Sequence, residues 1–349
     1  MKFAILKNET DDTLINWEIA CRKNSIAYEI IDLTRADWLS HFESDNFNML
    51  LACPPGRESL FKQLYDERIF ILEKELGYFI YPSQKEISIH ENKRFLSFWL
   101  EAHRIRHPQT WVFYDKNEAL NFAKASKLPL VGKFNIGSSG KGVKVLMRRK
   151  ELTDYIEAAF SEGLRQNWGP NLKMGGYIER LLKIIKNPAR IINRIRVYQK
   201  VYHELQKGFV ILQEYIPHDF EWRVVKIGNS YFGHQKVKQG DKASGTKGIK
   251  YVPPPMDLLN YVDRICSQHN LNSMAIDLFE NGDSEYLINE MQCIFGHVQQ
   301  YICSVHGKPG RFRLKNGEWI FEEGLFNSNL SFDLRLENAL AIAKTRINP

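Results

Sequence analysis

Two acidic residues near the end of the sequence have the spacing of a metal-binding pair. Asp277 lies in the segment AIDLF and Glu290 in LINEMQ, thirteen positions later. We predict two antiparallel strands joined by a turn at Asn281-Gly282-Asp283, which would place the two carboxylates side by side, with Gln292 on the same face. Two carboxylates and an amide oxygen suit Mg²⁺ bound to nucleotide phosphates. The alternative is that the acids face solvent, but apolar neighbours make unpaired acids costly there.

A glycine-rich stretch, NIGSSGKG at residues 135–142, has the composition of a phosphate-binding loop. Glycines let backbone N–H groups turn toward phosphate oxygens, and a lysine adds a point charge. The stretch does not match GxxxxGK[ST], and no helix follows it at once, so we do not predict a P-loop. A glycine-rich hairpin without a ligand is the alternative. The residues concerned are Gly137, Ser138, Ser139, Gly140, Lys141 and Gly142.

Further lysines and one mixed segment accompany these two features. Lys93 opens a predicted helix, Lys133 closes a predicted strand, and Lys236 lies on a strand that follows the segment QEYIPHDFEWR at 213–223. Taken singly, each lysine is best explained as a solvated surface charge. Together with the acidic pair they form an ordered series.

From Tyr81 to His297 the sequence resembles an ATP-grasp domain, in the style of the RimK-like and D-alanine–D-alanine ligase branches. The resemblance rests on motifs in the family's order: Asn92-Lys93 before an amphipathic helix, His107-Pro108-x-Thr110, the strand Leu130–Lys133, the glycine-rich stretch, Gln213–Ile216 and the acidic pair. It covers more than half of the chain. It implies an α/β protein with α+β lobes, in which an N-terminal Rossmann-like domain precedes the ATP-grasp fold.

The resemblance also implies roles for individual residues. Lys93, Lys133 and the glycine-rich stretch would bind phosphates. The strand Gln213, Glu214, Tyr215 and Ile216 would hold adenine, with Glu214 and the Ile216 backbone at the base and Glu221 at the ribose. Arg223 and Lys236 would act on the transferred phosphoryl group, and Asp277, Glu290 and Gln292 would bind the metal. Gln292 departs from the usual asparagine, and its carbonyl oxygen lies one methylene further from the backbone.

The implied reaction joins a carboxylate to an amine. The carboxylate attacks the γ-phosphate of ATP to give an acyl phosphate, and the amine then displaces phosphate, with Mg²⁺ or alternatively Mn²⁺ as the metal. Such a site works by positioning and charge neutralisation, which fits a sequence without a recognisable Ser–His–Asp or Cys–His arrangement. His234 and His297 are the histidines expected near the site, where a structural role is favoured for each.

The elements that position these residues alternate between strand and helix at the N-terminus. Strands are predicted at 2–6, 27–33, 47–53 and 78–81, with helices at 12–24 and 60–75, which indicates a parallel sheet. Later helices are predicted at 91–103, 117–126, 256–269 and 331–344, strands at 110–114, 130–134, 143–147 and 209–215, and hairpins at 221–237 and 274–291. We predict four segments: 1–82, 83–163, a basic helical insertion at 164–208, and 209–349.

Composition restricts the class of protein. The 349 residues are 44% hydrophobic and 26% charged, ordinary for a globular protein, and no apolar run is long enough to span a bilayer. The N-terminus lacks the features of a signal peptide, so we expect a cytoplasmic protein. Its five cysteines, none in a CxxC pair, are expected to be free thiols. A homodimer is a further expectation.

The net charge of +7 and the pI near 9.0 favour anionic partners. The basic stretch 165–208 has three interpretations: a solvated amphipathic helical pair, a surface for an anionic glycan or peptide acceptor, or contact with an anionic membrane. Lys308, Arg311 and Arg313, expected in a loop, are candidates to hold a substrate carboxylate. An ATP-grasp kinase, a regulatory nucleotide binder and a nucleic-acid-binding protein are the alternatives. The last explains the charge but not the acidic pair, and it is not expected.

Overall fold

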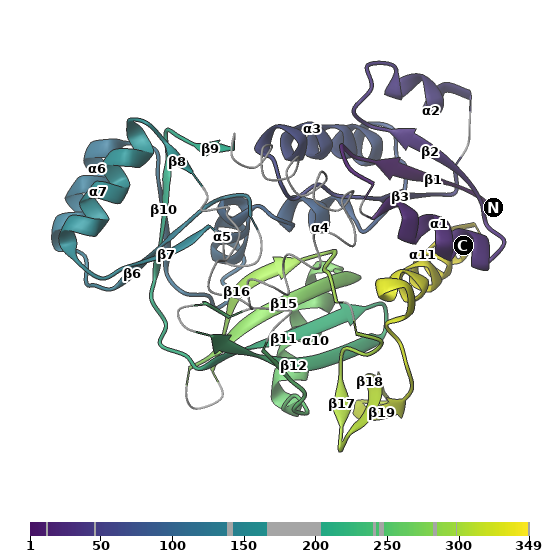
Figure 1. The fold of residues 1–349 in the computed structure, drawn as a ribbon. Coiled ribbons are helices and arrows are strands. Elements are labelled where there is room, and N and C mark those ends of the chain that lie inside the picture. Colours follow the sequence, from purple (N-terminus) through teal and green to yellow (C-terminus); the bar gives the residue numbers. More distant parts are fainter. Residues whose placement is uncertain are drawn as a thin grey trace, which may run out of the picture. The chain divides into compact units, whose positions relative to one another are not determined.

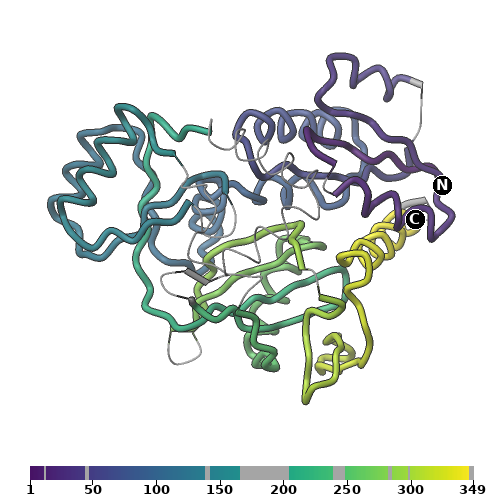
Figure 2. The backbone as a smooth tube through the Cα atoms, in the orientation of Figure 1, coloured from purple at the N-terminus to yellow at the C-terminus, as the bar shows by residue number. Residues whose placement is uncertain are grey.

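The chain forms two compact units in a computed structural model (Figure 1). Unit 1 comprises Met1–Gly56, Leu60–Gln109 and Ile216–Pro349, and unit 2 comprises Arg57–Ser59 and Thr110–Tyr215. Figure 2 traces the same backbone. The structure describes residues 1–11, 13–44, 47–137, 142–165, 204–239, 242–243, 248–281, 285–297 and 299–347.

Unit 1 begins with a parallel four-stranded sheet in the order β2-β1-β3-β4, which confirms the predicted alternation. Strands β1 and β3 are buried because they are almost wholly apolar, as parallel strands covered by helices are, whereas on the edge strand β2 only Ile31 is buried. Trp17 of α1 packs edge-on against Phe332 of α11, with ring centroids 4.8 Å apart. The elements are β1 Lys2–Lys7, α1 Leu14–Lys23, β2 Ala27–Asp32, η1 Trp38–Ser40, α2 His41–Ser44, β3 Met49–Ala52, α3 Ser59–Phe70, the π-helix η2 Ile71–Glu75 and β4 Ile80–Tyr81.

A second, mainly antiparallel sheet completes unit 1, in the order β16-β15-β11-β12-β18-β17, with β13 and β14 on β12 and β19 on β18. Helix α10 buries Leu258, Val262 and Ile265 and ends at Asn270, which has a left-handed backbone. The elements are β11 Phe220–Ile227, β12 Ser230–Gln239, β13 Lys242–Ala243, β14 Ile249–Lys250, α10 Met256–His269, β15 Ser273–Glu280, β16 Tyr286–Gln292, β17 Ser304–Val305, β18 Lys308–Lys315, β19 Glu318–Glu323, η3 Ser328–Ser331 and α11 Phe332–Ile347. The predicted turn residues Gly282 and Asp283 lie outside the described residues.

Two helices connect these sheets in sequence: α4 Gln84–Ile89 and α5 Lys93–Ala102. A capping box between Ser83 and Glu86 begins α4. The Glu86 carboxylate is fully buried and also accepts hydrogen bonds from the backbone N–H groups of Asn272 and Ser273, at 2.7 and 2.6 Å. These bonds fix α4, and therefore the chain that follows it, to the start of β15.

Unit 2 contains a four-stranded antiparallel sheet in the order β5-β10-β6-β7, packed against two helices. Gly132 on β6 is required by packing, because a Cβ there would lie 2.6 Å from the ring of Tyr155. The elements are β5 Thr110–Phe113, α6 Lys116–Ala125, β6 Leu130–Lys133, β7 Val143–Leu146, α7 Arg149–Phe160, β8 Leu164–Arg165, β9 Leu205–Gln206 and β10 Val210–Glu214.

The two units divide the chain differently from the four predicted segments. Residues 83–109 lie in unit 1, and β10 pairs with β5 and β6 in unit 2. Most of the basic stretch lies outside the described residues, at 166–203. The four-segment division therefore stays a prediction.

The expectation of a loop at Lys308, Arg311 and Arg313 is wrong. These residues lie on β18, which pairs with β17 at Lys308 and Pro309 and with β19 from Gly310 to Lys315. Lys308 forms an ion pair with Glu323 at 2.7 Å, and Arg311 with Glu322 at 3.0 Å. The carboxylates that these cations would need from a substrate are already supplied by the neighbouring strand.

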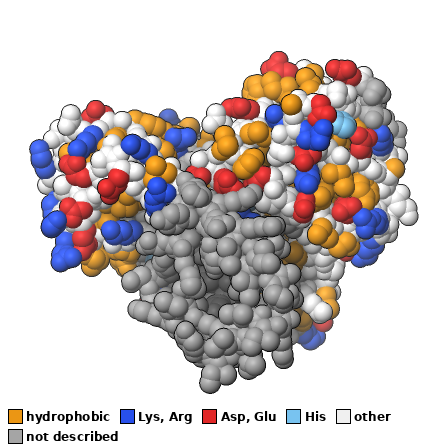
Figure 3. Space-filling view, turned by 45° about the horizontal axis from the view of Figure 1, so that its top comes forward, with side chains coloured by type: hydrophobic (Ala, Val, Ile, Leu, Met, Phe, Trp, Pro, Cys, Tyr) orange, Lys and Arg blue, Asp and Glu red, His pale blue; other side chains and the backbone are white. Residues whose placement is uncertain are grey.

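The distribution of charged residues, cysteines and apolar helices agrees with what the composition indicates. On the face shown in Figure 3, Lys and Arg side chains are intermixed with Asp and Glu over the described residues. All five cysteines are buried and free. None of the helices that the structure describes has the length and apolar character to span a membrane.

Candidate functional site

Four strands of unit 1 present polar side chains on one face of the antiparallel sheet, which we call the polar face. Asp277 on β15 lies directly opposite both Glu290 on β16 and Arg223 on β11, and Glu221 lies opposite Lys236 on β12. Directly opposed residues of antiparallel strands point to the same side of a sheet. The predicted side-by-side position of Asp277 and Glu290 on paired strands is therefore confirmed.

Asp277 is the centre of a buried ion-pair network. Arg223 donates two hydrogen bonds to its carboxylate, from Nε to Oδ1 at 2.7 Å and from Nη2 to Oδ2 at 2.8 Å. Lys236 Nζ donates to Asp277 Oδ2 and to Glu221 Oε2, each at 2.7 Å. All four residues are buried, with Asp277 only 1% exposed. The network therefore holds two cations and two anions rigidly away from bulk water.

The charged forms in this network are stabilised by each other. Burial alone would raise the pKa of Asp277, but the positive charges of Arg223 and Lys236 hold that pKa well below its usual range. Burial likewise opposes the charge on Lys236, yet Asp277 and Glu221 raise the pKa of its ammonium group. Asp277 and Lys236 are therefore both ionised at neutral pH.

A β-bulge shapes the outer strand of the polar face. Asp277 pairs with Glu290 and the next residue, Leu278, pairs with Ile288, so Asn289 is an extra residue on β16. A bulge of this kind re-aims side chains next to functional sites. Here Asn289 Nδ2 donates to Glu221 Oε1 at 3.2 Å, which shows that Asn289 reaches the same face as Glu290.

A second group of charges adjoins Glu290. Lys93, at the start of α5, lies 3.4 Å from Glu290 and 3.9 Å from Glu91. Burial lowers the pKa of Lys93, but Glu290 and Glu91 more than offset this and raise it above its ordinary value. Gln292 donates from Nε2 to Glu91 Oε1 at 2.9 Å. Lys93, Glu91, Glu290 and Gln292 thus form one connected group at the edge of the polar face.

Glu91 is held in place by its own backbone and by a glycine. It occupies the turn between α4 and α5 with a left-handed φ of +48° and is 6% exposed. A Cβ at Gly56 would lie 2.8 Å from Glu91 Cγ, so only glycine lets the 54–56 loop approach this closely. Packing against Gly56 therefore restricts the side-chain conformation of Glu91 and positions its carboxylate.

Comparisons with known proteins place this arrangement in a fold. No family model and no curated protein matches the sequence. Solved structures do match: a RimK-domain ATP-grasp protein from Sphaerobacter thermophilus (13% identity, TM-score 0.50, covering 83% of this chain and 90% of that one) and the D-alanine–D-alanine ligase of Bacillus anthracis (13%, 0.52, 99% of each chain). D-cycloserine synthetase DcsG matches similarly (13%, 0.53, 99% of each chain). The chain has the ATP-grasp fold. This confirms the fold expected from the sequence; identities this low carry no further conclusion.

Some of the residues predicted to bind the nucleotide lie in unit 2. Lys133 is buried on β6, and the register puts its side chain on the same face of the sheet as that of Gln213 on β10. Gln213 Nε2 donates to Thr110 Oγ1 at 2.9 Å. Glu214 pairs with Leu130 and points to the opposite face, so the register does not bring it to Lys133. The roles of these residues at a nucleotide stay predictions.

The glycine-rich stretch is described only at its ends. Phe134 N donates to the carbonyl of Gly142 at 2.9 Å, which closes the base of a hairpin between β6 and β7. Gly137 is also described, with a φ of 143°. Tyr215 and Ile216 follow β10 at the boundary between the two units. Ser138, Ser139, Gly140 and Lys141 lie outside the described residues.

The predicted metal ligands fit a divalent cation by their donor chemistry. Arg223 and Lys236 use three acceptor positions of the Asp277 carboxylate, which has about four. The hydrogen bond from Gln292 Nε2 to Glu91 commits the amide nitrogen and leaves the carbonyl oxygen as the atom for a metal. Among the described residues, no three His, Cys, Asp or Glu side chains form a metal cage by themselves.

Two histidines lie beside Arg223. His234 is opposite Arg223 on β12, and its Nδ1 is 2.9 Å from the carbonyl of Ile302. Burial, with Arg223 and His297, lowers the pKa of His234 to about 3, so its imidazole is neutral. The His234 and His297 ring centroids are 5.4 Å apart. The expected proximity of His234 to the polar face is therefore observed.

Sequence reasoning missed Glu91 and Asn289. Glu91 stands in the predicted helix 91–103, where it reads as an ordinary first-turn acid, and nothing local links it to Gln292. Asn289 was hidden because a bulge is a property of two paired strands. The one available signal was Ser83-x-x-Glu86, a capping-box pattern that indicates a separate helix ahead of Glu91.

Proposed function

We propose that the protein is an ATP-dependent carboxylate–amine ligase that forms a carbon–nitrogen bond through an acyl phosphate and releases ADP and phosphate. The observation that carries the proposal is the polar face, where the Arg223–Asp277–Lys236–Glu221 network adjoins the Lys93–Glu91–Glu290–Gln292 group. Buried cations beside oxygen ligands for a metal are what transfer of a phosphoryl group requires.

Each residue has a role in this scheme. Asp277, Glu290 and Gln292 would hold Mg²⁺, or alternatively Mn²⁺, which when bound neutralises charge on the phosphate oxygens. Arg223 and Lys236 remain charged and fixed, and would hold the transferred group and the carboxylate that attacks it. Glu221 orients Lys236 and would accept hydrogen bonds from the ribose. Lys93 and Lys133 would bind phosphate, as would the glycine-rich stretch.

Proteins with this fold support the assignment. Two of the structural neighbours are a D-alanine–D-alanine ligase and a D-cycloserine synthetase. A third neighbour, the biotin carboxylase domain of a 2-oxoglutarate carboxylase from Hydrogenobacter thermophilus, was solved with MgADP and bicarbonate. ADP, magnesium and a carboxylate-like anion thus occur together in a protein of this fold.

The substrate pair is proposed only by class. The acceptor is a carboxylate or amine of a small molecule, peptide or glycan, with an anionic or saccharide-linked compound favoured. Residues 166–203 contain eight lysines and arginines and one glutamate, so this segment accounts for the entire net charge of +7. We also propose a cytoplasmic location and a homodimer.

The decisive test is Mg²⁺-dependent ADP release with pooled carboxylates and pooled amines. Wild type is compared with Glu290→Ala and with Glu285→Ala, which removes an exposed carboxylate just before the same strand. We expect release to require one compound from each pool, to vanish in Glu290→Ala, and to continue in Glu285→Ala. The melting temperature of each variant shows that it is folded.

Other outcomes decide between the alternatives. Release that needs only the carboxylate or only the amine pool would favour a kinase or a different nucleophile. Stabilisation by ATP and Mg²⁺ without turnover would favour a regulatory nucleotide binder. If neither turnover nor stabilisation by nucleotide occurs, the proposed function is wrong.

A further inference from the structure

Unit 1 has a pocket that the proposed function does not use. It has a volume of about 450 Å³ and lies where the end of α5 meets α10, within the range of small-molecule sites. Ile105, Ile265 and Tyr286 form a buried floor, and Arg104, Arg106 and Arg264 stand at its exposed rim. We call it the arginine pocket. Its lining is mainly polar, which suits a charged ligand better than an apolar one.

The three arginines are poorly neutralised. Arg106 pairs with Glu285 at 2.9 Å, and that glutamate is itself exposed. Within the described part of the chain, neither Arg104 nor Arg264 has a carboxylate within 4 Å, although Arg264 lies over the ring of Tyr261. Burial raises the pKa of Tyr261, and the charges of Arg106 and Arg264 both oppose that rise. Arg106 and Arg264 therefore both lie close to Tyr261, and Arg104 lines the same pocket.

The lining of the pocket also carries a local excess of positive charge. Outside residues 166–203 the chain has equal numbers of basic and acidic residues, 40 of each. The pocket lining has three arginines and one acid, Asp257. A guanidinium group can bind two phosphate oxygens through two parallel hydrogen bonds, a geometry that an ammonium group does not offer. A phosphate is thus the group that the rim matches best.

The remaining polar groups indicate hydroxyls. The Asp257 carboxylate accepts from the Tyr286 hydroxyl, at 3.2 Å to each oxygen, and still has acceptor positions to offer. Asn260 accepts from Trp319 through its carbonyl oxygen at 2.8 Å, which leaves its NH₂ to donate. An acid beside three arginines would repel a bare phosphate but would accept hydrogen bonds from hydroxyls attached to it.

The arginine pocket is separate from the polar face. Tyr286 pairs with Glu280 and Ile288 with Leu278, whereas Glu290 pairs with Asp277. Because strand side chains alternate, Tyr286 and Leu278 point to the opposite side of the sheet from Asp277. The bulge at Asn289 puts Tyr286 and Glu290, which are four positions apart, on opposite faces of the sheet. A ligand in the pocket would not displace a ligand from the polar face.

We propose that the arginine pocket binds a small phosphate-bearing molecule that also carries hydroxyl groups, held by Arg104, Arg106 and Arg264 at the phosphate and by Asp257 and Asn260 at the hydroxyls. This site does not depend on the proposed ligase reaction. It gives the protein a second ligand site on the far side of the strand that carries Glu290 and Gln292.

Calorimetric titration of the full-length protein tests the proposal, with ribose 5-phosphate, inorganic phosphate and ribose as probes. The variant is Arg104→Gln/Arg264→Gln, and the control is Arg22→Gln/Arg35→Gln, which changes two exposed arginines that already have carboxylate partners. We expect ribose 5-phosphate to bind best, phosphate more weakly and ribose not at all. The pocket variant should weaken ribose 5-phosphate by at least about tenfold, and the control should not.

Three results would overturn the proposal. Equal binding of ribose 5-phosphate to wild type and the pocket variant would place the site elsewhere. Equal affinity for phosphate and ribose 5-phosphate would show that the hydroxyl groups contribute nothing to binding. Absence of binding by all three probes would remove the site. A second variant, Asp257→Asn, keeps the shape of the pocket and removes the charge that repels phosphate, so it should weaken the binding of ribose 5-phosphate relative to that of inorganic phosphate.

Discussion

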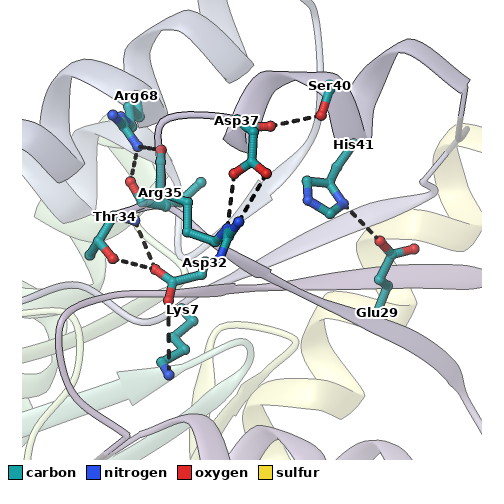
Figure 4. A network of polar contacts seen from close by, with 10 residues as sticks. Lys7, Glu29, Asp32, Thr34, Arg35, Asp37, Ser40, His41 and Arg68 are labelled. Atoms are coloured by element: carbon teal, nitrogen blue, oxygen red, sulfur yellow. Dashed lines mark hydrogen bonds and ion pairs between the residues drawn. The ribbon is translucent and has the colours of Figure 1, made fainter.

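Unit 1 contains two networks of acids and bases that look alike in composition and differ in what surrounds them. The first lies at the ends of β1 and β2 and includes Lys7, Asp32, Arg35 and Asp37 (Figure 4). There, Arg35 and Asp37 form two hydrogen bonds at 2.9 and 3.1 Å and are 64% and 55% exposed. The second is the network of the polar face, in which Arg223 and Asp277 are 9% and 2% exposed.

The networks also differ in how far apart their members lie in the sequence. Arg35 and Asp37 are two positions apart. Thr34 donates to the Asp32 carboxylate and Ser40 to the backbone carbonyl of Asp37, each within three positions. Arg223 and Asp277 are 54 positions apart. Local partners can find each other without a fold, and water screens them. Partners on three different strands exist only in the folded sheet, which is why the polar face and not the β1–β2 end is the candidate catalytic region.

We expect the largest difference between the two networks when one acid is removed from each and the free energy of unfolding is measured. Asp277→Ala leaves Arg223 and part of Lys236's charge buried without a partner, and we expect it to lower the free energy of unfolding by about 3–5 kcal/mol. Asp37→Ala should leave that free energy unchanged within error, since Asp37 is solvated. Urea denaturation of both variants measures the difference. Equal losses would mean that burial is not what distinguishes the two networks.

Glu91→Gln sharpens the comparison at the level of activity. It keeps an oxygen for Gln292 but removes the charge beside Lys93, so it acts on the orientation of groups that would hold metal and phosphate. We expect ADP release to fall by about 10–100-fold, with a higher Mg²⁺ requirement and a nearly unchanged melting temperature. Glu29→Gln is the matched control, because Glu29 lies on β2, away from the polar face, and pairs with Lys2 at 3.1 Å, and it should keep full activity. A loss of activity that more Mg²⁺ does not relieve at all would contradict this positioning role.

Acid should destabilise the buried region. His90, at the C-terminal end of α4, and His234 on β12 are both buried. Burial lowers the pKa of each to about 3, with Lys62 of α3 adding to the effect at His90 and Arg223 at His234. Each therefore takes up a proton only on unfolding between about pH 6.5 and pH 3, and stability is lost as the pH falls through that window. The loss is up to about 1.4 kcal/mol per pH unit for each histidine. Below about pH 4, Asp277 adds to it, because its folded-state pKa is depressed.

Urea denaturation at pH 7, 6 and 5 measures this slope. His90→Gln and His234→Gln should each remove roughly half of it, because each variant eliminates one proton uptake. The His90→Gln and His234→Gln proteins are compared with wild type at pH 7 to separate the slope from any change in basal stability. Slopes equal to that of wild type in both variants would show that other groups cause the acid sensitivity.

The sequence predicts the parts of the fold that depend on short-range patterns. The parallel N-terminal sheet follows from apolar strands that alternate with helices, and the side-by-side position of Asp277 and Glu290 follows from strand periodicity across a short connection. The order of motifs predicts the ATP-grasp fold. The first two features are specified by residues close together in the chain, and the third rests on the resemblance to a known family.

Features that need distant partners could not be predicted. The bulge at Asn289 depends on how β16 pairs with β15, and Glu91 reaches Gln292 across 201 positions. The arginine pocket joins residues near 105 to residues near 260 and 286. Even the face on which Glu214 points was not evident, because the sequence gives a strand at 209–215 but not the strand that it pairs with. Long-range pairing is decided by packing, and packing was not accessible from one sequence.

The smallest effect is expected at Lys308, and it tests whether exposed ion pairs ever belong with the functional region. Lys308 and Glu323 are 65% and 57% exposed on the β18–β19 hairpin, like Arg35 and Asp37 and unlike Arg223 and Asp277. A cation that is already paired and solvated gains little from a substrate carboxylate. Lys308→Gln should therefore leave the KM for the carboxylate and the kcat within about twofold of wild type. A rise in KM without a change in ATP binding would return Lys308 to the substrate site and show that exposure alone does not separate structural from functional ion pairs in this chain.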